Sequence, residues 1–354
     1  MDSKLEHIAQ VLAKDGSKVV FFVGAGISTN CGIPDFRSPK TGLYSNLQRL
    51  DLPFPEAVFD IDYFRENPKA FYTLAEEMYP GKYLPSRFHY FIRLCQEKHV
   101  LKRCYTQNID TLERVAGVKG DLVVEAHGSF TGNHCIDCHA GMDDETWKKL
   151  VKKGGIPKCP VCHGYVKPDI VFFGESLPAK FFDLWDEDSG DDYDLAIVAG
   201  TSLAVYPFAT LPAEVSKSTT RVLINKESCG DFEENPRDSD LLLMADCDST
   251  ATKLADLLGW SEELEELIEA GKKKLDVEGV KVKETVKEPP QTIVKKDTKK
   301  ESSASPLQKA EETAAGLAAK VAEAEKEKLP AIKKDKEVEE LTKAIENIDI
   351  KDGN

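Results

Sequence analysis

The chain has 354 residues, of which 41% are hydrophobic and 8% aromatic, so it can hold one large domain or two ordinary ones. Its nine cysteines are an odd number, and only four of them lie in close pairs, which argues against a secreted disulfide framework and favours a reducing compartment. The first residues lack an apolar signal core, and no run approaches the roughly 18 apolar residues of a membrane span. We therefore expect a soluble intracellular protein that makes no membrane contact.

The net charge of −15 is unevenly distributed. Residues 271–354 contain 19 lysines and 18 acidic residues, so the acidic excess belongs to residues 1–270. An acidic body should repel nucleic acid and attract basic partners. Plain solubility would explain the same charge. We expect no direct binding of nucleic acid.

Strand and helix patterns alternate along the body of the chain. Apolar runs at 18–23, 100–105, 194–198 and 221–224 predict strands, and stretches such as 88–98 predict amphipathic helices between them. Each of these runs leads into Gly, Ser, Thr or Asn. The pattern predicts an α/β fold in which a parallel sheet binds ligands at the carboxyl ends of its strands.

A glycine-containing loop follows the first predicted strand. In Gly24–Ser28 (GAGIS), glycine would let the backbone approach a pyrophosphate, and the next helix would offer free N–H groups. The third fingerprint position is Thr29, where Gly or Ala is usual, and a tight turn without a ligand would look similar. In the following GIPDFR motif, Arg37 could hold phosphate or lock the loop, and Phe36 could enclose a reactive carbon.

Two further polar clusters follow predicted strands, at Thr106–Asp110 (TQNID) and Gly200–Leu203 (GTSL). Each cluster alone is explained by a helix cap or a turn. Parallel strands, however, bring their carboxyl ends to one edge of a sheet. The three clusters together therefore predict a nucleotide site at that edge.

Two CxxC pairs, Cys135/Cys138 and Cys159/Cys162, are separated by 20 residues. This spacing predicts a zinc ribbon in which four thiolates surround the ion, and a redox role for CxxC is the alternative. A closed four-thiolate site has no open position, so the zinc would be structural. The neighbouring histidines, which we expect to be exposed, are His134, His139 and His163.

The chain resembles the sirtuin family from about residue 15 to 265, and it is most similar to the cytoplasmic and nuclear class I branch of fungi and animals. The motifs that carry the resemblance are the two CxxC pairs, GAGIS (24–28), GIPDFR (32–37), TQNID (106–110), HG (127–128), KPDIVFFGE (167–175), GTSL (200–203), INKE (224–227) and DCD (246–248). The resemblance implies a Rossmann-like large domain with helices on both faces of its sheet. It also implies a small domain that includes the zinc ribbon, at about 128–170, and a helical insertion at about 40–90.

The resemblance also assigns roles to residues. His127 would be the general base, with Asn108 and Asp110 at the nicotinamide end. The NAD site would include Ala25, Gly26, Ile27, Ser28, Thr29, Asp35, Phe36, Arg37, Gln107, Asn108, Ile109, Asp110, Gly200, Thr201, Ser202, Asn225, Lys226, Glu227 and the backbone of Cys247. The channel for the acylated lysine would be flanked by Phe36, Val171, Phe172, Gly174 and Glu175.

By resemblance, the protein would be an NAD-dependent deacetylase of histone and other lysines, with a role in chromatin silencing. It would transfer the acetyl group to ADP-ribose and release nicotinamide, 2′-O-acetyl-ADP-ribose and free lysine. His127 would deprotonate a ribose hydroxyl, a step suited to a side chain whose usual pKa is about 6.5. A lone His-Gly pair would otherwise be read as a turn. The alternatives are a mono-ADP-ribosyltransferase and a non-catalytic NAD sensor or scaffold.

The substrate channel should be apolar because an acetylated lysine is neutral. Sirtuin branches that prefer succinyl groups resemble one another in a Tyr and an Arg that clamp the acid. The matching segment here, Pro68–Tyr79, contains Tyr72 and Tyr79 but no Arg, so the resemblance favours acetyl and longer neutral acyl groups. An edge strand such as Ile170–Phe173 could pair with an extended peptide. The acidic body would favour lysine-rich targets such as histone tails.

The last aromatic residue is Trp260, and residues 271–354 lack Phe, Trp, Tyr, Cys and His. We therefore place the domain boundary near 270 and expect a mostly disordered tail, with one capped helix over 306–329. This helix could cover the substrate groove or mediate self-association. Leu341–Ile350 has the spacing of a nuclear export signal, and a short amphipathic helix would show the same spacing. An export receptor would give a cytoplasmic and nuclear protein.

Overall fold

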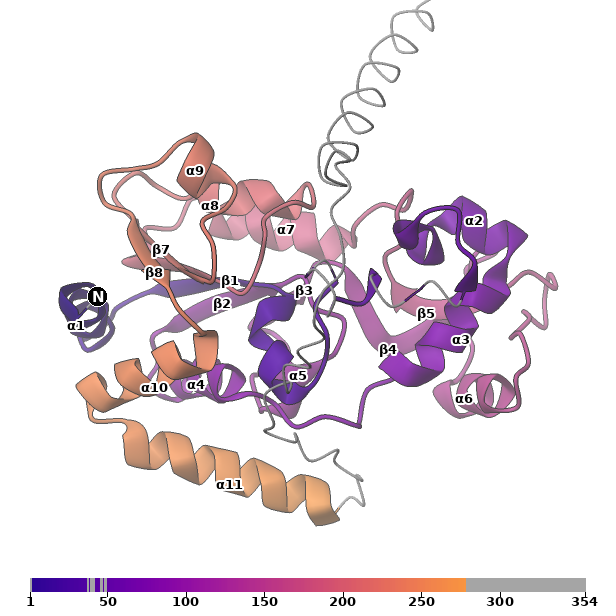
Figure 1. The fold of residues 1–354 in the computed structure, drawn as a ribbon, viewed down its shortest axis with the longest axis horizontal. Helices are drawn as coiled ribbons and strands as arrows, with labels where there is room; N and C mark the ends of the chain where they lie inside the picture. Colours follow the sequence, from indigo (N-terminus) through magenta and orange to yellow (C-terminus); the bar gives the residue numbers. More distant parts are fainter. Residues whose placement is uncertain (1, 37, 39–41, 45–46, 48–49, 278–354) are drawn as a thin grey trace, which may run out of the picture. The chain divides into compact units, whose positions relative to one another are not determined.

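Six parallel strands form the main sheet of the protein, whose computed structural model describes residues 2–277 except 37, 39–41, 45–46 and 48–49 (Figure 1). The strand order is β3-β2-β1-β6-β7-β8. The strands are β1 (Val19–Val23), β2 (Leu101–Thr106), β3 (Val123–Glu125), β6 (Leu195–Ala199), β7 (Thr220–Asn225) and β8 (Leu241–Met244). This order and the parallel pairing confirm the predicted Rossmann-like sheet.

Both faces of the main sheet are covered by helices, as predicted. Along β1, Val19, Phe21 and Val23 face one core, whereas Val20 and Phe22 face the other. Strands that are buried on both faces need uninterrupted apolar runs. The helices that cover the first core are α1 (Asp2–Leu12), α4 (Arg87–Glu97), α10 (Cys247–Leu258) and α11 (Ser261–Val277). The second core is covered by α7 (Ala179–Asp188), η5 (Phe208–Thr210), α8 (Leu211–Glu214) and α9 (Asp231–Glu234).

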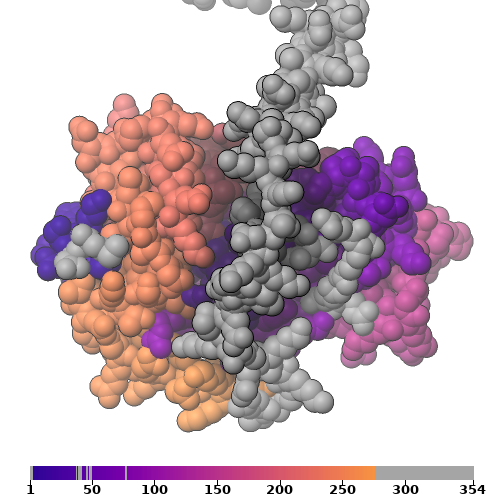
Figure 2. Space-filling view, in the orientation of Figure 1, coloured from indigo at the N-terminus to yellow at the C-terminus, as the bar shows by residue number. Residues whose placement is uncertain are grey.

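A smaller module has its own core. Its antiparallel strands β4 (Gly128–Cys135) and β5 (Val166–Ile170) pack with η4 (Pro55–Phe59), α2 (Ile61–Glu66), α3 (Pro68–Met78) and α6 (Asp144–Lys152). Edge-to-face contacts of Phe172 with Phe59, Phe64 and Phe71 stabilise this core. In Figure 2 the module forms a lobe of purple and pink atoms beside the larger domain. The helices of segment 55–78 and the ribbon strands thus share one core.

The order in which the chain adds strands to the main sheet reverses at β1. The chain runs outward from β1 to β2 and β3, and then returns to β6 on the other side of β1. At such a point an open α/β sheet binds ligands in a crevice outside the carboxyl ends of its strands. The loops after β1 and β6 begin at Gly24 and Gly200, so two of the predicted polar clusters meet at this crevice.

The strands predicted at 18–23, 100–105, 194–198 and 221–224 agree with β1, β2, β6 and β7 to within one residue at each end, whereas β3, β4 and β8 were not predicted. The expected edge strand Ile170–Phe173 is wrong: β5 ends at Ile170, because the next residues turn under the Glu175 carboxylate, which accepts a hydrogen bond from Phe172 N. Helix α11 continues past position 270 to Val277. The predictions for 306–329 and 341–350 fall outside the described residues. None of the helices that are described has both the length and the apolar content needed to cross a membrane.

Candidate active site

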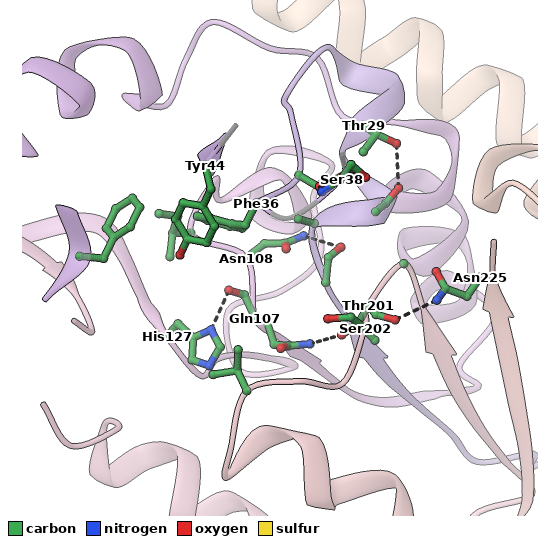
Figure 3. Close-up of a pocket in the computed structure, with 18 of the residues that line it drawn as sticks. Thr29, Phe36, Ser38, Tyr44, Gln107, Asn108, His127, Thr201, Ser202 and Asn225 are labelled. Carbon is green, nitrogen blue, oxygen red and sulfur yellow. Dashed lines mark hydrogen bonds between the residues drawn. The ribbon is translucent and has the colours of Figure 1, made fainter. Parts of the chain in front are cut away.

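A cavity of about 530 Å³ lies between the carboxyl edge of the main sheet and the smaller module. Its walls come from the loops after β1, β2, β6 and β7, from His127 before β4, and from the segment after β5. Figure 3 shows Gln107, Asn108, His127 and Thr201 converging on it. Its volume is within the range of ligand sites in proteins.

The loop after β1 packs directly against the loop after β6. Gly26 N donates to Gly200 O at 2.7 Å, and a Cβ added at Gly26 would lie 2.6 Å from Gly200 Cα. The N–H groups of Ile27 and Ser28 are also engaged, within the loop itself. The expected helix after the GAGIS motif is instead two short 3-10 turns, η1 (Ala25–Ile27) and η2 (Thr29–Cys31). The loop therefore lacks the helix expected directly after the motif, and its glycines serve packing between the two loops.

Amide side chains connect the loops around the cavity. Gln107 Nε2 donates to Thr201 Oγ1 at 2.7 Å, and Asn225 Nδ2 donates to Thr201 O at 3.0 Å. Asn108 Nδ2 donates to Gly24 O at 3.2 Å. These bonds fix the carboxyl ends of β1, β2, β6 and β7 relative to one another.

His127 has a defined proton arrangement. Its Nδ1 lies 3.1 Å from Gln107 O, and because a carbonyl only accepts, Nδ1 must carry the proton (Figure 3). Nε2 then has a lone pair, and it has no hydrogen-bond partner within the described part of the chain. Burial lowers the pKa of His127 below its ordinary value, so the ring is neutral near pH 7. A neutral imidazole with a free nitrogen in a cavity can act as a general base.

The segment after β5 forms an apolar wall of the cavity. Val171 N donates to His127 O at 2.9 Å, which joins this wall to the base. Phe36 contacts Phe59, and Phe59 contacts Phe172, so three rings line one side. A neutral, extended side chain such as an acylated lysine suits this surface.

A buried ion pair stabilises the turn that follows β5 and carries the apolar wall of the cavity. Lys167, which is 1% exposed, lies 2.9 Å from Glu175 Oε2 and 2.6 Å from Ile170 O. The same carboxylate atom accepts from Phe172 N at 2.8 Å. Gly174 has φ +91°, a conformation that favours glycine. Sequence analysis did not identify Lys167.

Most of the predicted site residues line this cavity: Ala25, Gly26, Thr29, Asp35, Phe36, Gln107, Asn108, Ile109, His127, Val171, Phe172, Gly174, Glu175, Gly200, Thr201, Ser202, Asn225, Lys226, Glu227 and Cys247. Ile27, Ser28 and Asp110 do not line it, and Ser28 and Asp110 bond each other behind the loop. Arg37 lies outside the described residues. Four further lining residues belong to the quoted motifs but were not predicted as site residues: Gly24, Ile170, Phe173 and Asp246. The lining residues that lie outside the motifs, and were also not predicted, are Ser38, Tyr44, Phe59, Leu177, Val205, Tyr206 and Ala245.

The four paired cysteines come together at one end of the smaller module. All four sulfurs lie within 4.8 Å of one another, with Cys135–Cys162 at 3.4 Å and Cys138–Cys159 at 3.5 Å. Thiolates around tetrahedral zinc, at about 2.3 Å from the ion, lie roughly 3.8 Å apart. Backbone N–H groups of Asp137 and Val161 each donate to a sulfur. The cluster thus fits a structural zinc site, as predicted. Of the nearby histidines, His139 and His163 are exposed as expected, whereas His134 is only partly exposed and bonds Asp169.

Comparison with known proteins covers most of the described chain. Residues 24–207 match the sequence model of the Sir2 family. The NAD-dependent protein deacetylase HST2 of Candida albicans is 59% identical over 80% of this chain and 85% of its own length. The NAD-dependent protein deacetylase sirtuin-3 of Mus musculus is 48% identical over 77% of this chain and 81% of its own. The NAD-dependent protein deacetylase sirtuin-2 of Danio rerio is 46% identical over 75% of this chain and 74% of its own length.

Proposed function

Because this chain belongs to the Sir2 family, we propose that it is an NAD-dependent deacetylase of protein lysines. The observation that carries the proposal is the free Nε2 of His127, held in one tautomer between the polar loops and the aromatic wall. The relatives that match over most of the chain are named NAD-dependent protein deacetylases.

Each part of the cavity has a task in this reaction. The loops after β1, β6 and β7 would hold NAD, through Thr201, Ser202 and Asn225 among others. NAD, when bound, supplies the electrophilic ribose carbon from which nicotinamide leaves. His127 Nε2 would take a proton from a hydroxyl group, and Gln107 O would stabilise the charged ring through Nδ1. The rings of Phe36, Phe59 and Phe172 would seat the acyl chain and limit access of water.

The preferred acyl group is acetyl or a longer neutral chain. Tyr72 donates through its hydroxyl to Val166 O at 2.6 Å, in the core of the module. The Tyr79 hydroxyl bonds Asp144. Neither tyrosine lines the cavity, so neither is placed to bind an acidic acyl group. Faster removal of succinyl than of acetyl from matched peptides would contradict this preference.

The substrates we propose are acetylated lysines in basic segments such as histone tails. The net charge of residues 1–270 is strongly negative, which supports attraction of lysine-rich peptides. Acetyl-peptides of equal length with neutral or basic flanks would test this. We expect the basic peptide to have the lower KM, and that advantage to shrink as salt is raised.

A cytoplasmic and nuclear location is also proposed, on the export-signal spacing of Leu341–Ile350. Replacing Ile348 and Ile350 together by Ala should shift a fluorescent fusion toward the nucleus. An unchanged distribution would reject the idea.

Deletion of 278–354 tests whether the tail lowers activity or drives self-association. Unchanged kinetics would exclude the first effect, and an oligomeric state unchanged by the deletion would exclude the second.

One assay tests the activity itself. The full chain is incubated with NAD and an acetyl-lysine peptide, and the products are identified by mass. We expect nicotinamide, acetyl-ADP-ribose and deacetylated peptide in equal amounts. Transfer of ADP-ribose to protein would favour the mono-ADP-ribosyltransferase alternative. NAD binding without any turnover would favour a sensor or scaffold.

A further inference from the structure

A polar cluster lies behind the cavity, between α4 and α5 (Leu112–Val115). One ring nitrogen of His89 and one carboxylate oxygen each of Asp110 and Glu113 lie within 4.8 Å of one another. His89 is 0% and Glu113 1% exposed, whereas Asp110 is partly buried. Among the described residues, His89 Nε2 and both Glu113 oxygens lack hydrogen-bond partners. Such atoms are rare and costly in protein interiors, so the protons of this cluster need an account.

The tautomer of His89 follows from the capping of α4. Ser86 N donates to His89 Nδ1 at 3.1 Å, so Nδ1 carries no proton. Burial lowers the pKa of His89 to about 3, and the ring is neutral. The single ring proton must therefore be on Nε2, which has no hydrogen-bond partner among the described residues. A neutral ring in this tautomer brings no positive charge to the cluster, and its protonated Nε2 has no lone pair to offer a metal ion.

Asp110 is the member best suited to a negative charge. Its Oδ2 accepts from Ser28 Oγ at 2.6 Å, and its Oδ1 accepts from Leu112 N at 2.9 Å. Both donors favour the ionised carboxylate, although burial raises its pKa. The Thr106 hydroxyl and the backbone N–H of Glu113 lie near the Glu113 carboxyl group and lower its pKa in part, but neither of its oxygens accepts a hydrogen bond of normal geometry among the described residues.

Glu113 is the member best suited to hold a proton. Burial and the charge of Asp110 raise the pKa of Glu113 to about 8. Two carboxylates this close in an apolar interior do not both ionise readily. The titratable groups found near Glu113 in the described part of the chain are His89 on α4, Asp110 before α5, Cys104 on β2 and Glu125 on β3. His89 is neutral, and Glu125 is paired with Arg114. None of these four groups therefore brings a positive charge to Glu113.

We propose that Glu113 keeps its proton in the active protein, so that Asp110 is the single charged carboxylate of the cluster and keeps its position against Ser28 behind the cavity. The positioning reaches the cavity through one chain of donors. Asn108 Nδ2 lies 3.4 Å from Ser28 Oγ, and Ser28 Oγ donates to Asp110. Loss of the Glu113 proton would place a second negative charge beside Asp110 and disturb its bond to Ser28. The inference rests on the proposed function, because its activity test measures the NAD-dependent reaction in the cavity that Asn108 lines.

The activity test compares the wild type with Glu113→Gln, which is neutral at every pH and nearly the same shape. For the wild type, kcat/KM for NAD should fall about tenfold between pH 7 and pH 9, as one group with a pKa near 8 ionises. In E113Q, kcat/KM for NAD should be nearly the same at pH 7 and pH 9. The KM of the wild type for the acetyl-peptide should not change in this pH range. The control is Glu97→Gln, which removes an exposed carboxylate on α4 and should keep the wild-type fall.

Two measurements decide the protonation without catalysis. The carbon-13 resonance of the Glu113 carboxyl, assigned by its loss in E113Q, should report a neutral group at pH 7. Because its folded pKa is raised, Glu113 contributes stability that is fully present below about pH 4 and is lost as pH rises to about 8. The Tm of E113Q relative to wild type should therefore increase between pH 5 and pH 8.

The results separate the two proposals. Absence of deacetylation at every pH would reject the proposed function, while the resonance and Tm would still test the proton on Glu113. An ionised Glu113 at pH 6 would overturn the inference. So would an alkaline fall of equal size in E113Q, or a second tightly bound metal ion that is lost in E113Q, because the cluster would then bind a cation.

Discussion

The Nδ1 atom of His127 donates to the carbonyl oxygen of Gln107 at 3.1 Å, and this bond fixes which nitrogen of the ring is free. Gln107 is itself held, because its N–H donates to Val23 O and its side chain to Thr201. The carboxyl ends of β1, β2 and β6 thus position both the nucleotide loops and the base. In this arrangement Nε2 is the only ring nitrogen of His127 that can accept a proton in the cavity.

Replacing His127 by Ala should lower kcat for deacetylation by about 10²- to 10⁴-fold, the usual contribution of general base catalysis. The fold, the zinc content and NAD binding should persist, because the ring makes only one hydrogen bond among the described residues. The matched control is His7→Ala on the exposed face of α1. Turnover of H127A within a fewfold of wild type would remove His127 from the mechanism.

The acid side of the pH profile should report His127. Burial lowers the pKa of this ring, so the base-competent neutral form persists below pH 6.5. We expect kcat/KM for the acetyl-peptide to be constant from about pH 7 down to about 6.5 and to fall at lower pH. A midpoint well above 6.5 would mean that another group, or a charged His127, controls the rate.

Gly128→Ala should destabilise the fold by about 2 kcal/mol or more. Gly128 has φ +68°, and an added Cβ would lie 1.8 Å from Asp169 O, so both strain and a backbone clash oppose the substitution. Gly190→Ala is the control, because a Cβ there meets nothing within 4 Å. Denaturant unfolding of both variants measures the difference. Equal stability would show that β4 and β5 pair less closely at Gly128 than the structure indicates.

Local sequence features were enough to predict the parts of the site that follow strands. Glycine and polar residues after 23, 106 and 199 identified the carboxyl edge, and the CxxC spacing identified the zinc ligands. Both inferences depend on residues that are adjacent in sequence. The parallel sheet then brings the three loops together by topology.

The remaining features depend on contacts between distant segments. Gly26 and Gly200 pack against each other across the switch point, and no pattern in either loop predicts that pair. Phe59 and Tyr206 line the cavity only because their segments fold over it. The carboxyl groups near His89 belong to Asp110 and to Glu113 on α5, more than 20 residues away in sequence. Such contacts arise from tertiary packing, which periodicity and motif spacing do not describe.

Zinc should be required for the smaller module and, through it, for activity. The cysteine cluster ends the β4–β5 pair, whose other end joins His127 O to Val171 N. Cys138→Ser should reduce bound zinc from about one ion per chain and lower activity strongly. Cys95→Ala, in the core of the main domain, should keep the zinc. Full activity of zinc-free protein would show that the active site does not depend on the zinc ribbon.

Lys167→Met should weaken binding of the acetyl-peptide more than binding of NAD. Lys167 is the buried cation that pairs with Glu175 and bonds Ile170 O, so its loss leaves the turn that carries Val171 and Phe172 without its anchor. Because the Glu175 side chain is 24% exposed, water can partly replace the lysine, and we expect KM for the peptide to rise about tenfold rather than the module to unfold. Lys152→Met on the exposed surface of α6 is the control, and Lys167→Arg, which keeps the charge, should recover part of the loss. An equal rise in the KM values for NAD and for peptide would show that Lys167 supports the cavity as a whole and not the acyl-lysine wall.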